Sequence, residues 1–202
     1  MRKKTEEKKE EIIKAAKEVF KEFGFEKASM SKISSKLGGS KATLYNYFSS
    51  KEELFFEVIS IANAQESDFV HQIIDTKNET LDIHTQLYEF GKRFINFVYS
   101  QKMVEIRRLT ISQSEITNLG RITYKNRVLK SREILSKYLE KAIKFNKIKK
   151  TDTNIAAIHF FGLLESELMY PFLFQVDTDF SKKHMDEMAE RAIDIFILAY
   201  GV

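Results

Sequence analysis

Residues 40–51 gather side chains suited to bonding nucleic acid, in the run SKATLYNYFSSK. Leu44 and Phe48 are four residues apart, so on a helix both can face a protein core. The polar side chains between them are then left for the outer surface. Hydroxyl groups can bond phosphate oxygens, and tyrosine rings can pack on thymine methyl groups. The outward set predicted for DNA contact is Lys41, Ala42, Thr43, Tyr45, Asn46 and Tyr47.

Lys51 stands where the following helix is expected to begin. There its ammonium group and the first backbone N–H groups of that helix can both face a phosphate. The competing interpretation of the whole run is an ordinary helical hairpin with a polar edge, which needs no ligand.

A longer helix is expected to precede this surface. Residues 6–23 carry apolar side chains at spacings of three and four, which define one helical face, and Gly24 is expected to end the helix. The predicted inner face consists of Ile12, Ala16, Val19, Phe20 and Phe23.

Two short helices are expected to follow. Ser29 can cap a helix over 30–37, and Ser40 can cap another over 41–47, with a tight turn at the glycine pair 38–39. Two short helices joined in this way and packed on a longer one form a helix-turn-helix, whose second helix enters the DNA major groove.

Charge is distributed unevenly along the chain. Residues 1–51 carry 13 Lys and Arg against 7 Asp and Glu, whereas residues 52–202 carry 20 against 22. A basic segment joined to a slightly acidic remainder suggests polyanion binding. A solvated Lys/Glu helix face would give the same imbalance and stays open as an alternative on charge alone.

The stretch from Ile12 to Ile59 resembles the DNA-binding domain of the TetR/AcrR family of bacterial regulators, most specifically in SKATLYNYFSSKEELF at 40–55. The resemblance implies phosphate or groove-edge contacts for Ser29 and Ser31, and phosphate contacts for Tyr47 and Lys51. The full set expected to bind DNA is Ser29, Ser31, Ser40, Lys41, Ala42, Thr43, Tyr45, Asn46, Tyr47 and Lys51.

Two positions depart from the family pattern. Gly39 stands where the family usually has a β-branched or other apolar residue, and Ala28 stands where a threonine is common. The glycine removes a packing side chain, so we expect a looser turn before the second short helix.

The remainder of the chain also has a helical period. Helices are expected over 79–100, 121–146, 153–174 and 182–200, with Phe180 and Met185 as a hydrophobic staple on the last. The predicted stripe of the first of these is Ile83, Leu87, Phe90, Phe94 and Phe97. We therefore expect an all-α fold of about nine helices, with a helix-turn-helix domain over 1–50 and a larger effector-binding and dimerisation domain over 51–202.

The second domain is rich in phenylalanine, with 13 of the 17 in the chain. Most should be core, but the resemblance implies that some line an apolar effector site. Glu165 and Glu167 lie in an apolar run and can pair with a cationic ligand or, as we favour, with an arginine of another helix. The candidate effector residues are Phe90, Phe94, Phe97, Phe161 and Glu165.

The resemblance also implies a homodimer built by the last two helices of each chain as a four-helix bundle. We call the second helix of the helix-turn-helix the reader helix. The two reader helices of a dimer, about 34–36 Å apart, would meet successive major grooves, so the operator should be a near-palindrome. The candidate interface residues are Phe160, Leu164, Leu168, Ala192, Ile193 and Phe196.

Several classes of protein are disfavoured. The absence of cysteine excludes disulfides and thiolate metal sites, and we see neither a signal peptide nor a run of apolar residues of membrane-spanning length. We therefore expect a cytoplasmic protein with no cofactor, no metal and no membrane partner.

An enzyme and a helical adaptor are the competing function classes. Of the four histidines only His71 has an acidic residue three positions earlier, Asp68, so a paired di-iron motif is not supported, and no catalytic motif appears. An adaptor would lack salt-dependent DNA affinity. We favour a transcriptional regulator, released from DNA when a small, largely apolar ligand binds residues 52–202.

Overall fold

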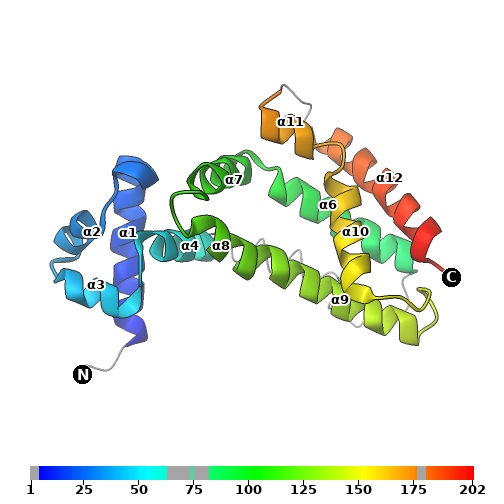
Figure 1. Cartoon of the computed structure of the whole chain (residues 1–202), viewed down its shortest axis with the longest axis horizontal. Helices are drawn as coiled ribbons and strands as arrows, with labels where there is room; N and C mark the ends of the chain where they lie inside the picture. The colour runs from blue at the N-terminus through cyan, green and yellow to red at the C-terminus, as the bar shows by residue number, and fades with distance from the viewer. Residues whose placement is uncertain (1–4, 63–73, 75–81, 177–180) are drawn as a thin grey trace. The chain divides into compact units, whose positions relative to one another are not determined.

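The computed structural model describes residues 5–62, 74, 82–176 and 181–202 (Figure 1). These residues are almost entirely helical, which confirms the all-α class. No helix in these ranges is long and apolar enough to cross a membrane. The predicted staple residue Phe180 and the pair Asp68 and His71 lie outside the described residues.

The chain divides into two compact units, each considered by itself. Unit 1 comprises Met1–Ala64 and Thr110–Thr123, and unit 2 comprises Gln65–Leu109 and Tyr124–Val202. The expected domain boundary after residue 50 falls within the first segment of unit 1.

Unit 1 contains the predicted helix-turn-helix. The longer α1 packs against α2 and α4, α2 packs against α3, and α4 packs against the short α8 (Figure 1). Both short helices begin and end as predicted. The bounds are α1 Glu6–Lys27, α2 Met30–Leu37, α3 Lys41–Tyr47, α4 Lys51–Ala62 and α8 Leu119–Thr123.

Gly24 changes which phenylalanine enters the core of unit 1. Its backbone is non-helical at φ 70°, ψ 172°, so the regular helix ends there as predicted and a further helical turn runs to Lys27. The prediction that Phe23 faces inward is wrong: its side chain is 37% exposed, whereas Phe25 is buried. The ring of Phe25 packs 4.7 Å from that of Phe55, which closes the core between the end of α1 and α4.

Unit 2 is built around α6, α10 and α12, which pack against one another, with α9 against α10. Gly91 allows close packing, because a Cβ atom there would lie 3.0 Å from a Leu164 methyl carbon. The bounds are α6 Ile83–Val98, α7 Gln101–Gln113 (which begins in this unit), a π-helical turn Tyr124–Val128, α9 Leu129–Lys144, α10 Thr153–Glu165, α11 Met169–Phe174 and α12 Lys182–Tyr200.

Two predicted helices of this part of the chain are wrong in detail. The helix expected over 153–174 is interrupted between α10 and α11. Pro171 has no backbone N–H, and its ring would clash with the carbonyl four residues earlier in a continuous helix. The helix expected over 121–146 contains the π-helical turn between α8 and α9.

Candidate nucleic-acid interface and effector site

The reader helix α3 is held by its cap and by its inner face. Ser40 Oγ accepts a hydrogen bond from the Thr43 N–H at 3.2 Å, as expected of an N-cap. Leu44 and Phe48 are buried, as the sequence predicted. The N-cap and the buried side chains of Leu44 and Phe48 therefore hold α3 in place, while its polar face is directed outward.

The predicted contact residues of α3 differ in how far they reach the surface. Lys41, Ala42, Tyr45 and Asn46 are exposed, and the side chain of Tyr45 is 53% exposed. Positions 41 and 45 are one helical turn apart, as are positions 42 and 46, so the four side chains share one face. This face carries an ammonium, a phenol and an amide, the groups that bond phosphates and base edges.

Tyr47 and Lys51 have internal partners that the sequence did not indicate. Tyr47 Oη accepts a hydrogen bond from the Thr5 N–H at 3.0 Å, which ties α3 to the start of α1. Lys51 Nζ donates to the Phe25 carbonyl oxygen at 2.9 Å and lies 4.2 Å from the centre of that ring. Both residues thus hold unit 1 together, and their phosphate contacts stay a prediction.

Ser29 caps α2 by accepting a hydrogen bond from the Lys32 N–H at 3.2 Å. Ser31 is half-buried and lines a shallow groove between α1 and α2. Two lysines of α2, Lys32 and Lys36, also line this groove. Sequence reasoning left them out of the DNA-contact set, although a basic pair four residues apart on one helix was visible in the sequence. The lining residues of the groove are Val19, Glu22, Phe23, Ser31, Lys32, Ser35 and Lys36.

The turn between α2 and α3 uses its two glycines differently. Gly38 is left-handed at φ 69°, ψ 24°, and its N–H bonds to carbonyls near the end of α2. Gly39 does not require the left-handed region, and a Cβ atom there would lie 3.6 Å from a Leu37 methyl carbon, an ordinary contact. A side chain at position 39 would contact Leu37, so this is the packing contact that Gly39 lacks.

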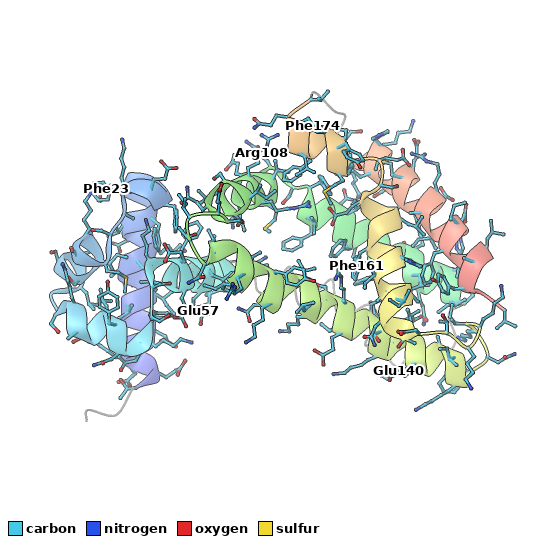
Figure 2. The ribbon with its side chains drawn as sticks, viewed as in Figure 1. Phe23, Glu57, Arg108, Glu140, Phe161 and Phe174 are labelled. Atoms are coloured by element: carbon cyan, nitrogen blue, oxygen red, sulfur yellow. The ribbon has the colours of Figure 1, made fainter. Side chains whose placement is uncertain are left out.

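Three of the candidate effector residues gather in unit 2. The rings of Phe94 and Phe161 are 4.7 Å apart, and Phe90 lies 6.1 Å from Phe94 and 6.2 Å from Phe161. We call Phe90, Phe94 and Phe161 the phenylalanine cluster. Figure 2 shows Phe161 on α10, between the helices of unit 2. Phe97 is buried in the same core but has no ring contact with the cluster among those recorded for the described residues.

Glu165 pairs with an arginine of another helix, as favoured from the sequence. Arg107 of α7 donates to Glu165 Oε2 at 2.7 Å, and Tyr99 Oη donates to the same oxygen at 2.9 Å. Burial, with the neighbouring carboxylate, raises the pKa of the Tyr99 phenol, which keeps it a neutral donor. Glu167 makes a more exposed pair with Arg191, at 2.8 and 3.1 Å.

The candidate interface residues face the wrong way. All six are buried inside unit 2 of a single chain, so they are unavailable to a second chain, and that prediction is wrong. Helices α10 and α12 expose a different set of apolar side chains on their opposite sides. The buried residues are Phe160, Leu164, Leu168, Ala192, Ile193 and Phe196, and the exposed ones are Ile155, Ile158, Ile195 and Leu198.

Among the residues described, no group of three or more acidic or histidine side chains is placed to hold a metal ion. The geometry defines a class of protein: a helix-turn-helix unit joined to a larger helical unit with an aromatic interior.

Comparisons with known proteins specify the family. Residues 12–58 match the model of bacterial regulatory proteins of the tetR family, and residues 85–202 match that of the AefR-like transcriptional repressor C-terminal domain. The chain belongs to the TetR family of bacterial transcriptional regulators, and its larger unit matches a repressor's C-terminal domain.

Three matches show the similarity to known proteins. The fatty acid metabolism regulator protein of Bacillus subtilis is 27% identical over 158 residues, which are 77% of this chain and 78% of that protein. The structure of a TetR-family regulator from Mesorhizobium loti is 28% identical, covering 98% of this chain and all of that one, with a TM-score of 0.78. The regulator FadR of Bacillus subtilis, solved with stearoyl-CoA, shares the fold at 19% identity and a TM-score of 0.61, covering 94% and 97% of the two chains. These relatives are regulators rather than enzymes.

Proposed function

We propose that this protein binds a near-palindromic operator as a homodimer and leaves it when a largely apolar effector binds unit 2. The observation that carries the proposal is the exposed polar face of α3, set on the buried pair Leu44 and Phe48. A reader helix that enters the major groove needs a polar outer face and a buried inner face that holds it on its own domain.

The exposed apolar side chains of α10 and α12 support the homodimer. Ile195 and Leu198 are three residues apart on α12, and Ile155 and Ile158 have the same spacing on α10. Leu198 is 76% exposed, which is costly for a leucine that meets only water. We define these four residues as the dimer face, and a second copy of the chain, carrying the same face, is its proposed occupant.

The phenylalanine cluster supports an apolar effector. Aromatic side chains that line a site favour apolar ligands, with few polar groups to orient them. The relatives include a fatty acid metabolism regulator of Bacillus subtilis, and the FadR regulator of that organism was solved with stearoyl-CoA. A long-chain acyl compound is therefore the effector class that we propose, with Phe90, Phe94, Phe97, Phe161 and Glu165 as its candidate site.

The test of the DNA surface uses exposed residues, because replacing Tyr47 or Lys51 would also remove internal contacts. Binding is measured by fluorescence anisotropy on DNA from directly upstream of the protein's own coding region, across a salt series. A phosphate contact predicts that Lys41→Ala lowers the salt slope by about one, and a base contact predicts that Tyr45→Ala alters the preference among operator variants. Lys144→Ala, an exposed lysine at the end of α9, is the matched control and should change neither.

The outcomes separate the two function classes. Salt-dependent binding that Lys41→Ala or Tyr45→Ala weakens supports the reader surface. Wild-type protein that binds no upstream fragment at any salt concentration would instead favour a helical adaptor, and equal losses in all three variants would remove α3 from the interface.

A further inference from the structure

Two buried hydrogen-bond donors of unit 2, Arg107 Nη1 and Arg132 Nε, have no acceptor among the described residues, and the first adjoins an ion pair. Arg107 uses Nη2 to bond Glu165, whereas its Nη1 is buried and makes no hydrogen bond to any of them. Native proteins pair nearly all buried polar groups, so an unpaired guanidinium nitrogen calls for an acceptor from a ligand or from ordered water.

Aromatic rings hold this guanidinium in place. Its central carbon lies 4.7 Å from the centre of the Tyr99 ring and 4.5 Å from that of Phe172. Both rings are 2% exposed. Cation–π contacts and the bond to Glu165 together fix the donor before any ligand arrives, which lowers the entropic cost of binding.

The fixed donor is linked to the phenylalanine cluster through α10. Phe161 and Glu165 are four residues apart on α10, so they lie on the same face of that helix. Phe161 contacts the ring of Phe94, and Glu165 holds Arg107. The apolar cluster and the oriented donor are therefore held one helical turn apart along α10, which suits a molecule with a long apolar part ending in one acceptor.

The local charge selects the kind of acceptor. Glu165 already neutralises Arg107, and the side chains of the two are only 16% and 21% exposed. A ligand carboxylate at Nη1 would add a second negative charge near Glu165 with little water to screen it. The nearby Arg108 is exposed to solvent, where its charge is screened. An uncharged carbonyl oxygen accepts the same bond without that repulsion.

We propose that Arg107 Nη1 donates a hydrogen bond to the uncharged carbonyl oxygen of a long-chain acyl thioester or ester whose chain packs on the phenylalanine cluster. This inference rests on the proposed function, because it assigns a residue-level role within the proposed effector site.

The test compares probes that differ at the carbonyl. Binding of palmitoyl-CoA and of S-hexadecyl-CoA, a thioether without the carbonyl oxygen, is measured on the full-length protein by calorimetry. S-hexadecyl-CoA should bind roughly 5- to 150-fold more weakly, the loss expected when a buried donor has no acceptor. Methyl palmitate should bind more tightly than palmitate, and its rank against palmitoyl-CoA distinguishes an ester from a thioester source.

Variants assign the effect to the Arg107 side chain. Arg107→Met should bring the affinity ratio of palmitoyl-CoA to S-hexadecyl-CoA close to one. Arg107→Lys keeps the charge near Glu165 and serves if the methionine variant fails to fold. It should lower the ratio, because its one nitrogen is held at Glu165 and has no second nitrogen in the place of Nη1. Arg191→Met is the matched control, because Arg191 also pairs with a glutamate but in an exposed place, and it should keep the wild-type ratio.

The outcomes separate the role of Arg107 from the effector class. Equal wild-type affinities for palmitoyl-CoA and S-hexadecyl-CoA would overturn the role of Arg107 and leave the acyl effector class intact. An unchanged ratio in both Arg107 variants would do likewise. No binding of any probe would overturn the effector class and this inference with it, whereas operator binding, measured in parallel without ligand, tests the DNA-binding proposal separately.

Discussion

Gly38 and Gly39 offer a paired perturbation of the turn that sets the reader helix. Replacing Gly39 with Ala adds a Cβ atom at an ordinary 3.6 Å from Leu37 and does not require a left-handed backbone. Replacing Gly38 with Ala adds the same atom where φ is 69°. The two variants therefore differ in backbone strain rather than in side-chain chemistry.

The expected magnitudes have opposite signs. A compatible Gly-to-Ala change stabilises a fold by about 0.4–1 kcal/mol, chiefly because the unfolded chain loses freedom. A left-handed alanine costs about 1–2 kcal/mol. Local opening of the α2–α3 region should thus become about 2- to 5-fold rarer in Gly39→Ala and about 5- to 30-fold more frequent in Gly38→Ala.

Hydrogen exchange of the peptide covering 30–47 in the full-length protein measures this opening. Exchange should slow in Gly39→Ala and accelerate in Gly38→Ala, with peptides of unit 2 unchanged in both. Faster exchange in Gly39→Ala would refute the reasoning, because it would show that position 39 needs a conformation only glycine adopts.

Three further predictions concern the dimer face and two helix caps. Leu198→Glu should convert the dimer to monomer in sedimentation analysis, whereas Ile116→Glu, at a residue of matching 75% exposure in unit 1, should leave it dimeric; a dimeric Leu198→Glu protein would exclude the dimer face. Ser40→Ala should cost α3 about 1 kcal/mol by removing the bond to Thr43 and should weaken operator binding in anisotropy; unchanged affinity would show that the cap is dispensable. Asp82 caps α6, and its hydrogen bonds lower its pKa below the ordinary 3.8. The contribution of this carboxylate to the free energy of unfolding is therefore complete above pH 3.8 and is lost as the pH falls through the lowered pKa. The difference in melting temperature between wild type and Asp82→Ala should therefore shrink below pH 3.8, and a difference that grew instead would contradict this sign.

Local sequence signals were enough for the helix-turn-helix. The caps Ser29 and Ser40, the glycine turn and the spacing of Leu44 and Phe48 involve residues within a few positions of one another, so the pattern alone specified them. The left-handed conformation of Gly38 follows from the same local logic.

Long-range partners were beyond this reasoning. The class of partner for Glu165 could be predicted, since a buried carboxylate needs a cation, but nothing in the sequence selected Arg107, 58 positions away. The bonds from Thr5 to Tyr47 and from Lys51 to Phe25 likewise depend on how helices pack.

The orientation of α10 and α12 was predicted wrongly because both helices are apolar on two sides. Periodicity identifies an apolar face but does not say which of two such faces enters the chain's own core. In α10, Phe160 is buried while Ile158 is exposed, and in α12, Phe196 is buried while Leu198 is exposed. Burial in the folded chain was needed to separate the core from the proposed dimer face.

The central claim, release of an operator-bound homodimer by an apolar effector, is tested most directly by nuclease protection. DNA from upstream of the coding region is digested in the presence of the protein, with and without palmitoyl-CoA. The account predicts a protected near-palindrome whose half-sites are centred about 34–36 Å apart, and loss of protection when palmitoyl-CoA is added. Protection of a single half-site, or protection that palmitoyl-CoA leaves unchanged, would contradict it.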